Sequence, residues 1–403
     1  SDGAIPPLVT LLSSSEVVCA RYAAMSLCNL AADTDNQRLI VEHGALKPLM
    51  QLGYSTDLDC QRYAGMTLCN LSTHQKNRLQ MVQEGVLPSI VVLARSDRLE
   101  VQRAAALTLY NLSCLPANQI PIRDAGAVMP LVQLCQSADV DCRRYSVMAL
   151  CNESSNSETR VEVARGGGLQ ALILVSKDED VECKRYATIA LCNLACDDHM
   201  QVQIVVHGGL RPAVEMARAA GDVETQRHAV MLLANLSANE ENHETMVKAQ
   251  VIPDLVQLTR VSEDLDARLF AAYGLANFAS NVDYYSLMGD EGALVPLIAL
   301  ATSEDPNSQC LAVAGLRRML ELEENRLQLV RLNGLGAISA GGLSYELETK
   351  REVAAALNNL SLTDDLKEPI AASPAVQTLV NLGQSKDLET ARQAVGAVAN
   401  LAE

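Results

Sequence analysis

The sequence predicts an all-α solenoid of about ten repeats, each built of three helices. Two recurring phrases and one feature of the composition lead to this prediction. Gly-Ala-x-x-Pro-Leu-Val recurs along the 403 residues, and Leu-Cys-Asn-Leu recurs in step with it. Two independent phrases with one period indicate a repeat protein, in which each unit packs on its neighbours. With two Phe and no Trp, the core must rely on Leu, Ala and Val, which favours closely packed helices.

The first phrase marks a turn in each repeat. It begins at Gly3 and returns every 41 residues up to Gly208, after which the steps are 40 to 42 residues long. We therefore predict one domain, residues 1–403. Its repeat turns are predicted at Gly3, Gly44, Gly85, Gly126, Gly167, Gly208, Gln250, Gly292, Gly334 and Pro374.

The second phrase puts an asparagine at one place in almost every repeat, and we call this row the Asn ladder. Arg318 takes that place in the remaining repeat. The ladder is continuous through seven repeats, and beyond Arg318 its flanking residues become small. We therefore expect a weaker or different surface near the carboxyl end. The ladder consists of Asn29, Asn70, Asn111, Asn152, Asn193, Asn235, Asn277, Asn359 and Asn400.

Turn chemistry predicts the three helices of a repeat. Gly44 can adopt a positive φ and end a first helix. Pro48 stands near the start of a second helix, where a missing N–H costs little. Asp57 closes a polar link and can cap a third, longer helix. For this repeat we predict helices at residues 37–42, 46–52 and 58–72.

Composition narrows the chemistry. A net charge of −17 argues against a general affinity for nucleic acids or anionic lipids. The twelve cysteines fall inside helical apolar patterns, which predicts buried thiols in a reducing compartment. Pairs nine residues apart in one helix are roughly 13 Å apart along its axis, too far to share a metal ion. These pairs are Cys19/Cys28, Cys60/Cys69, Cys142/Cys151 and Cys183/Cys192.

A helical wheel predicts which face of the third helix is free. With about 100° per residue, Ala24, Leu27 and Cys28 lie opposite Asn29 and are expected to pack inward. Tyr22 and Met25 lie on the asparagine side, and this arrangement recurs in later repeats. A helix that is apolar on both sides is either fully buried or presents a binding surface.

The two phrases resemble those of armadillo repeats, and the resemblance covers essentially the whole chain. It implies a right-handed armadillo-repeat superhelix whose groove holds extended segments of other proteins. Importin-α-like members pair the asparagine with a tryptophan four residues earlier, but this chain has Met66, Leu107, Met148, Ile189 and Met231 there. Without Trp, the cation–π contacts to lysine are lost. The sequence therefore looks closer to the β-catenin and vacuolar armadillo scaffolds.

We predict a partner-binding groove in which asparagine amides bond to a peptide backbone while Tyr and Met supply adaptable apolar contact. In the alternative interpretation the asparagines bridge adjacent repeats and Tyr and Met only complete the packing. The predicted groove residues, besides the first seven ladder asparagines, are Tyr22, Tyr63, Tyr145, Tyr186, Met25, Met66, Met148 and Met231.

An arginine stands eight residues before most ladder positions. Such a row could form a basic rim that attracts acidic or phosphorylated partner segments. Alternatively, each arginine pairs with an acid three residues earlier on its own helix. The predicted rim residues are Arg62, Arg103, Arg144, Arg185 and Arg227, and the same place is held by Arg21, Arg351 and Arg392.

These features predict a non-enzymatic scaffold or adaptor that binds other proteins, with no cofactor and no metal. Six scattered histidines form no catalytic constellation. A nuclear transport receptor and an architectural rod in a ciliary or cytoskeletal assembly are the alternatives. We expect a cytoplasmic protein, with a nuclear location as the alternative. No direct membrane insertion is expected, although a flanking segment could carry an anchor or attach the protein to the cytoskeleton.

Overall fold

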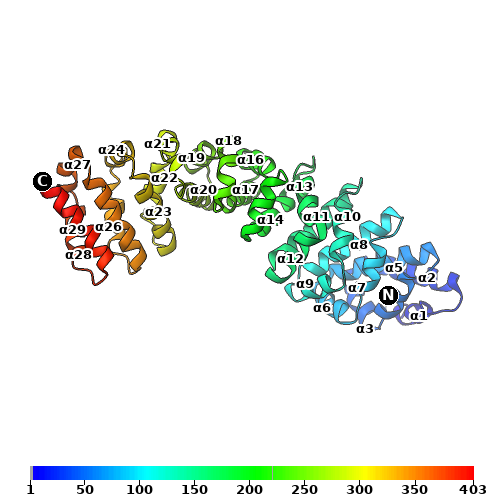
Figure 1. The fold of residues 1–403 in the computed structure, drawn as a ribbon. Helices are drawn as coiled ribbons and strands as arrows, with labels where there is room; N and C mark the ends of the chain where they lie inside the picture. Colours follow the sequence, from blue (N-terminus) through cyan, green and yellow to red (C-terminus); the bar gives the residue numbers. More distant parts are fainter. Residues whose placement is uncertain (1–2, 220) are drawn as a thin grey trace. The chain divides into compact units, whose positions relative to one another are not determined.

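The computed structural model describes residues 3–219 and 221–403, and these residues form helices α1 to α29 with no strand among them (Figure 1). The all-α prediction is confirmed. Two short 3₁₀ segments, Glu240–Asn242 and Val282–Tyr284, and one π-helical segment, Ala164–Gly168, adjoin the α-helices.

The helices follow the predicted order of short first, short second and long third. The first helices are α3 (Thr34–Glu42), α6 (Gln75–Gln83), α9 (Pro116–Asp124), α12 (Ser157–Val163), α15 (Asp198–Val206), α18 (His243–Lys248), α21 (Tyr285–Glu291), α24 (Glu323–Arg331) and α27 (Asp364–Ala371). The second helices are α1 (Ile5–Leu11), α4 (Leu46–Gly53), α7 (Leu87–Leu93), α10 (Val128–Leu134), α13 (Leu169–Val175), α16 (Leu210–Arg218), α19 (Val251–Val261), α22 (Leu294–Leu300), α25 (Leu335–Gly341) and α28 (Ala375–Gly383).

The third helices carry the Asn ladder. They are α2 (Val17–Leu30), α5 (Leu58–Thr73), α8 (Leu99–Ser113), α11 (Val140–Ser155), α14 (Val181–Leu194), α17 (Val223–Ser237), α20 (Leu265–Phe278), α23 (Pro306–Met319), α26 (Leu347–Ser361) and α29 (Leu388–Ala402). The prediction for α5 ends one residue early, and that for α4 likewise. The prediction for α3 starts three residues late, because Asp33 caps that helix through the amides of Asp35 and Asn36.

Most repeat turns have the predicted backbone. φ is positive at Gly44, Gly85, Gly126, Gly167, Gly208 and Gly292, and also at Gln250 (64°). Gly334 is an exception, because the positive φ (58°) falls on the preceding Asn333 while Gly334 has φ −71°. Asparagine tolerates the left-handed region better than other side chains do, so it takes over the role of glycine. Pro374 has φ −59°, since its ring fixes that angle.

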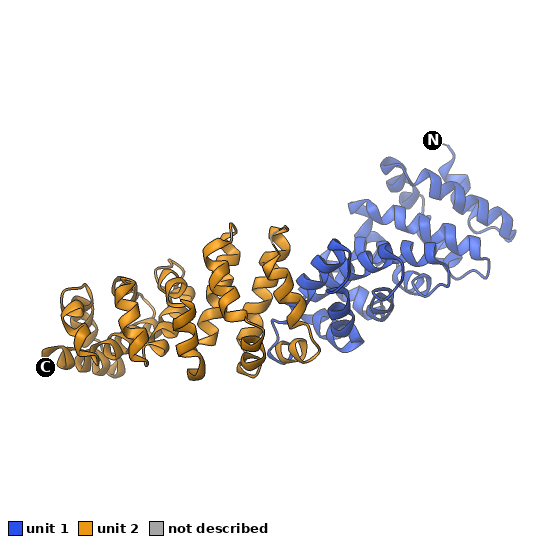
Figure 2. Cartoon of the chain, turned by 90° about the horizontal axis from the view of Figure 1, so that it is seen from above, with its two compact units in different colours: residues 1–200 blue, residues 201–403 orange. Residues whose placement is uncertain are grey.

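The chain divides into two compact units, residues 1–200 and 201–403, drawn in blue and orange in Figure 2. We call them unit 1 and unit 2. Within unit 1 each third helix packs on the next, from α2 through α14. Unit 2 contains the same kind of stack from α17 through α29. The single predicted domain stays a prediction.

The core lies between successive third helices and their second helices. Small residues such as Ala24, Ala64 and Ala187 are fully buried, which lets the helix backbones approach closely. Leu27, Leu68 and Leu109 fill the space between them and are also fully buried. The inward side of the helical wheel was therefore predicted correctly. No helix within the described residues is both long and apolar enough to cross a bilayer.

Candidate partner-binding surface

The structure places the predicted Tyr and Met side chains at the surface. In α2, Tyr22 is 61 % exposed and Met25 is 37 % exposed. The corresponding residues of the later repeats are half-buried. They are Tyr63, Met66, Tyr145, Met148, Tyr186 and Met231. We call this surface the third-helix face: the ladder position and the residues four and seven places before it.

The ladder asparagines hold adjacent repeats together. The Nδ2 of Asn70 donates to the Cys28 carbonyl of the preceding third helix at 3.1 Å. Later asparagines donate to a serine in the last turn of the preceding third helix. The Nδ2–Oγ distances are 3.0 Å for Asn111–Ser72 and Asn152–Ser113, and 3.1 Å for Asn193–Ser154. The carbonyls in the last turn of a helix have no partner within the helix and can accept hydrogen bonds. The serine hydroxyl in the same turn is a further acceptor for the asparagine.

The same bond recurs in unit 2. Asn277 donates to the Ala234 carbonyl at 3.1 Å and to Ser237 Oγ at 3.2 Å. Asn359 donates to the Arg317 carbonyl, and Asn400 to Ser361 Oγ. These asparagines therefore bridge adjacent repeats, as the alternative interpretation expects, and each bond runs to the preceding repeat.

These bonds leave part of several asparagine amides unused. Among the described residues, no hydrogen bond reaches the Oδ1 atoms of Asn70, Asn152 and Asn193, which are half-buried. Asn29 is exposed, and Asn235 and Asn277 are half-buried. Asn111 differs, because only 7 % of it is exposed, so it is poorly placed to meet a partner. Partner binding by the ladder stays a prediction.

The arginine row has a structural role that sequence reasoning missed. An aspartate caps most third helices by accepting a hydrogen bond from a backbone amide of the first turn, as Asp139 does from Cys142 at 2.9 Å. The arginine of the preceding repeat then binds the same carboxylate with two nitrogen atoms. Arg103 reaches Asp139 at 2.6 Å (Nη2–Oδ2) and 3.3 Å (Nε–Oδ1). We call this arrangement the Arg–Asp clamp.

The clamp occurs in both units. It joins Arg21 to Asp57, Arg103 to Asp139, Arg144 to Asp180, Arg227 to Asp264 and Arg351 to Asp387. A guanidinium and a capping amide both favour the charged carboxylate, so the pKa of Asp57 and that of Asp139 fall to about 2. The predicted pairing within one helix also exists, as in Arg185–Glu182 at 3.1 Å and Arg351–Glu348 at 3.3 Å.

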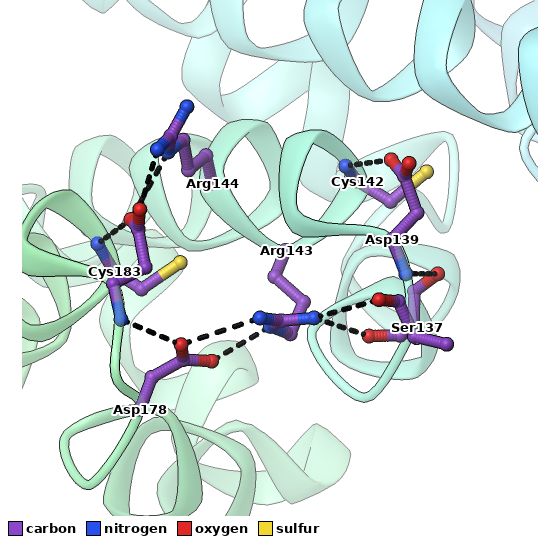
Figure 3. Close-up of polar contacts among 9 residues, drawn as sticks. Ser137, Asp139, Cys142, Arg143, Arg144, Asp178 and Cys183 are labelled. Carbon is purple, nitrogen blue, oxygen red and sulfur yellow. Dashed lines mark hydrogen bonds and ion pairs between the residues drawn. The ribbon is translucent and has the colours of Figure 1, made fainter.

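Figure 3 shows the junction between α11 and α14, where Arg143 adds a second contact. Its Nε donates to Asp178 Oδ2 at 2.7 Å, and its Nη1 donates to the Ser137 carbonyl at 2.9 Å. It therefore ties the link before its own helix to the link before the next one. Arg144 on the same helix makes the clamp to Asp180.

Within the described residues, Arg62 of the row has no clamp. The cap position after Arg62 is held by Arg98, whose side chain makes no cap hydrogen bond. Arg98 Nη1 donates to Asp59 Oδ1 at 3.1 Å. Asp59 is the acid three residues before Arg62, so this acid is already paired with Arg98. Arg62 is left with Glu100 at 3.7 Å (Nε–Oε1) and with the ring of Tyr63, whose centroid lies 5.5 Å from the guanidinium carbon.

Tyr110 adjoins the third-helix face of unit 1, although it was not predicted. It directly precedes Asn111, and its ring stacks on that of Tyr145 with centroids 6.5 Å apart. Burial raises the pKa of its hydroxyl to about 12, so the ring remains neutral. The sequence offered one sign of this role, because Tyr110 directly precedes a ladder residue at a place where several other repeats have cysteine.

In unit 2 the third-helix face has a different composition. The tyrosine position holds His228, Phe270, Leu311, Glu352 and Gln393 in turn. Tyr273 stands four residues before Asn277 and its hydroxyl lies 2.6 Å from Ser308 Oγ. Beyond it the same position holds the small residues Ala314, Ala355 and Gly396. The repeated Tyr–Met–Asn pattern is therefore a property of unit 1.

The paired cysteines are buried free thiols, with one exception. Cys19 is exposed, contrary to prediction, and among the described residues no third helix precedes α2 to cover that side. Burial raises the pKa of Cys69, Cys151 and Cys192 to about 12 and keeps them protonated. Within the described residues, no three His, Cys, Asp or Glu side chains converge to hold a metal ion.

Glu153 is a buried acid in unit 1. It follows ladder residue Asn152, where neighbouring repeats have Leu112 and Leu194, and its side chain is fully buried. Among the described residues neither carboxyl oxygen has a hydrogen-bond partner. Burial raises its pKa to about 8, although the charge of Arg123 opposes the shift.

The chain matches the Armadillo/beta-catenin-like repeat family at residues 33–73, 74–114 and 363–403. Each matched segment spans 41 residues, which is the predicted period. A search of curated protein sequences found no match.

Solved structures with the same fold include engineered proteins. One, from the Northeast Structural Genomics Consortium, is 28 % identical over 100 % of this chain and 99 % of its own, with a TM-score of 0.80. A designed armadillo repeat protein in complex with the peptide (KR)4 is 23 % identical over 58 % of this chain and 99 % of its own, with a TM-score of 0.52. At that identity the likeness shows the fold alone.

Proposed function

We propose that this chain, which matches the Armadillo/beta-catenin-like repeat family in three segments, is a non-enzymatic scaffold that binds extended segments of other proteins on its third-helix face. One observation carries the proposal. In unit 1 a tyrosine and a methionine or isoleucine accompany the ladder asparagine on α2, α5, α11 and α14, while α8 has Ala104 and Leu107 at the same places. A regular row of apolar side chains at a protein surface indicates a site where another protein binds.

The spacing of this surface suits an extended chain. Packed helices lie about 8–10 Å apart, and three residues of extended chain cover about 10 Å. One partner residue in three would therefore meet the apolar side chains of a third helix, while its backbone reaches the unused oxygen of a ladder asparagine. The thioether of methionine adapts to different side chains, which suits partners of varied sequence.

The comparisons support the proposal in general terms. A solved structure has a designed armadillo repeat protein in complex with a peptide, so a protein of this fold can bind one. That peptide consists of Lys and Arg, whereas this chain has no Trp to contact such cations. We therefore propose partner segments that are apolar or acidic, in the cytoplasm, and disfavour a nuclear transport receptor.

A peptide-display selection followed by paired substitutions tests the proposal. Met66→Ser with Met148→Ser removes apolar contact from the third-helix face, while the ladder bonds and clamps stay intact. The matched control is Leu79→Ser with Leu174→Ser, since both leucines are exposed on first and second helices. We expect binding to weaken at least about tenfold in the methionine variant and less than about twofold in the control, because the lost apolar contact is worth ~1–2 kcal/mol.

Equal affinity of both variants for the selected peptides would overturn the assignment of this face. A selection that yields only Lys- and Arg-rich peptides would favour the transport-receptor alternative over the scaffold.

A further inference from the structure

We infer that Arg62 is the recognition site for a carboxylate, carried by an acidic side chain of the segment bound on the third-helix face. The inference rests on the proposed function and adds a charge preference and a position to it. It starts from the difference between Arg62 and the arginines of the clamps.

Every clamp needs an aspartate at the cap of the next third helix. Arg21, Arg103 and Arg144 each have one in unit 1, so their guanidinium groups bind it with two nitrogen atoms. At the junction between α5 and α8 the cap position holds Arg98. Arg62 consequently lacks the carboxylate that its counterparts bind. The acid three residues before it, Asp59, is bound to Arg98.

The contacts of Arg62 position its guanidinium without occupying it. The nearest acid, Glu100, is 3.7 Å away, which is beyond hydrogen-bond distance. The guanidinium carbon lies over the ring of Tyr63, 5.5 Å from the ring centroid. Among the described residues its Nε is buried and has no hydrogen-bond partner, although 38 % of the side chain is exposed. A partner can reach only the exposed part of this guanidinium, so its terminal nitrogen atoms are the donors that can bind a carboxylate.

The surroundings favour a carboxylate over a phosphate. An arginine fork and a carboxylate match in shape and can form two parallel hydrogen bonds. A phosphate carries close to two negative charges, and both Glu100 and Asp59 lie nearby and would repel it. Tyr63 and Met66 of the third-helix face adjoin Arg62 on the same helix, so an acidic residue here continues into the apolar part of the surface.

The decisive substitution is Arg98→Asp. It supplies the missing cap carboxylate and frees Asp59, so Arg62 becomes engaged within the protein as its counterparts are. Arg62→Gln removes the guanidinium directly. Arg95→Gln is the matched control for Arg62→Gln. Arg95 is exposed and lies outside the row, and both substitutions change the net charge by the same amount. Thermal unfolding of Arg98→Asp should occur at the wild-type temperature or higher, because a helix cap is gained.

The probes are fluorescent pools of ten-residue uncharged peptides with Glu, Gln or phosphoserine fixed at one scanned position. At one position wild type should prefer the Glu pool over the Gln pool by about threefold to tenfold. Arg62→Gln and Arg98→Asp should reduce this preference to less than about 1.5-fold, and Arg95→Gln should keep it.

Other outcomes overturn the inference. Equal binding of the Glu and Gln pools by wild type, or an undiminished preference in Arg98→Asp, rejects Arg62 as the site while the scaffold proposal stands. A preference for phosphoserine without one for Glu rejects the carboxylate. Failure of all pools to bind rejects the proposed function and this inference with it.

Discussion

Units 1 and 2 are built on the same framework but present different surfaces. In both, ladder asparagines donate to the preceding third helix, as Asn70 does in unit 1 and Asn277 in unit 2. In both, arginines clamp the aspartate cap of the next helix. Yet the position that holds Tyr145 in unit 1 holds Glu352 in unit 2, where it binds Arg317 at 2.6 Å. The bonds that stack the repeats therefore do not dictate the residues that face a partner.

This difference distinguishes two sets of positions within the repeat. Residues at the ladder position and eight places before it make bonds between repeats, so they recur wherever a neighbour must be held. Residues four and seven places before the ladder make few such bonds. They are free to differ, and in unit 1 they are tyrosine or an apolar residue, with Ala104 and Leu107 replacing Tyr and Met on α8. Partner specificity is expected to reside there.

The largest expected effect concerns the core of unit 1. Unit 2 has Leu236, Phe278 and Leu360 where unit 1 has Glu153. The folded-state pKa of Glu153 is about 8, above its ordinary value near 4.5. Its contribution to stability is therefore complete below pH 4.5 and is lost as the pH rises toward 8. At pH 7 the penalty is on the order of 3 kcal/mol.

Glu153→Leu should therefore raise the free energy of unfolding at pH 7 by about 3 kcal/mol and flatten its dependence on pH. Urea unfolding at pH 5, 7 and 8.5 measures both, with hydrogen exchange of α11 as a local readout because long repeat arrays need not unfold in two states. Glu153→Gln should flatten the pH dependence with a smaller gain. A wild-type stability that does not fall from pH 5 to pH 8 would contradict the buried-acid account.

A smaller effect is expected from the clamps. Asp139→Ala removes a helix cap and the partner of Arg103 together, so it should destabilise unit 1 by about 1–2 kcal/mol. Asp387→Ala should act similarly in unit 2, since it loses the same two contacts. Arg62→Gln, at the junction without a clamp, should change stability by less than about 0.5 kcal/mol. Urea unfolding compares the three variants, and equal losses would show that the clamp contributes nothing.

The smallest effect should come from the ladder. Asn70→Ala and Asn359→Ala each delete one hydrogen bond to a carbonyl of the preceding helix, which is worth about 1 kcal/mol. Because this bond belongs to the shared framework, the two losses should agree within about 0.5 kcal/mol. Hydrogen exchange near each site would detect a difference. A loss in one unit only would mean that the framework is not common to both.

The sequence predicted the repeat and its helices because their causes are local. Gly44 and Asp57 act on the backbone beside them, and the wheel of α2 follows from its own spacing. The Arg–Asp clamp was missed because its two members are 36 residues apart, and the nearer acid offered a simpler partner. Asn111 is buried although Asn152 and Asn193 make the same serine bond and are half-buried, a difference between repeats that the sequence pattern does not reveal.

Photo-crosslinking tests the central claim most directly. A benzoylphenylalanine at position 66 or 148 reports on the third-helix face, and one at position 79 or 174 reports on the first and second helices. With a peptide that binds the full chain, we predict crosslinks from positions 66 and 148 that unlabelled peptide competes away, and none from 79 or 174. Crosslinks confined to positions 79 and 174 would contradict the account.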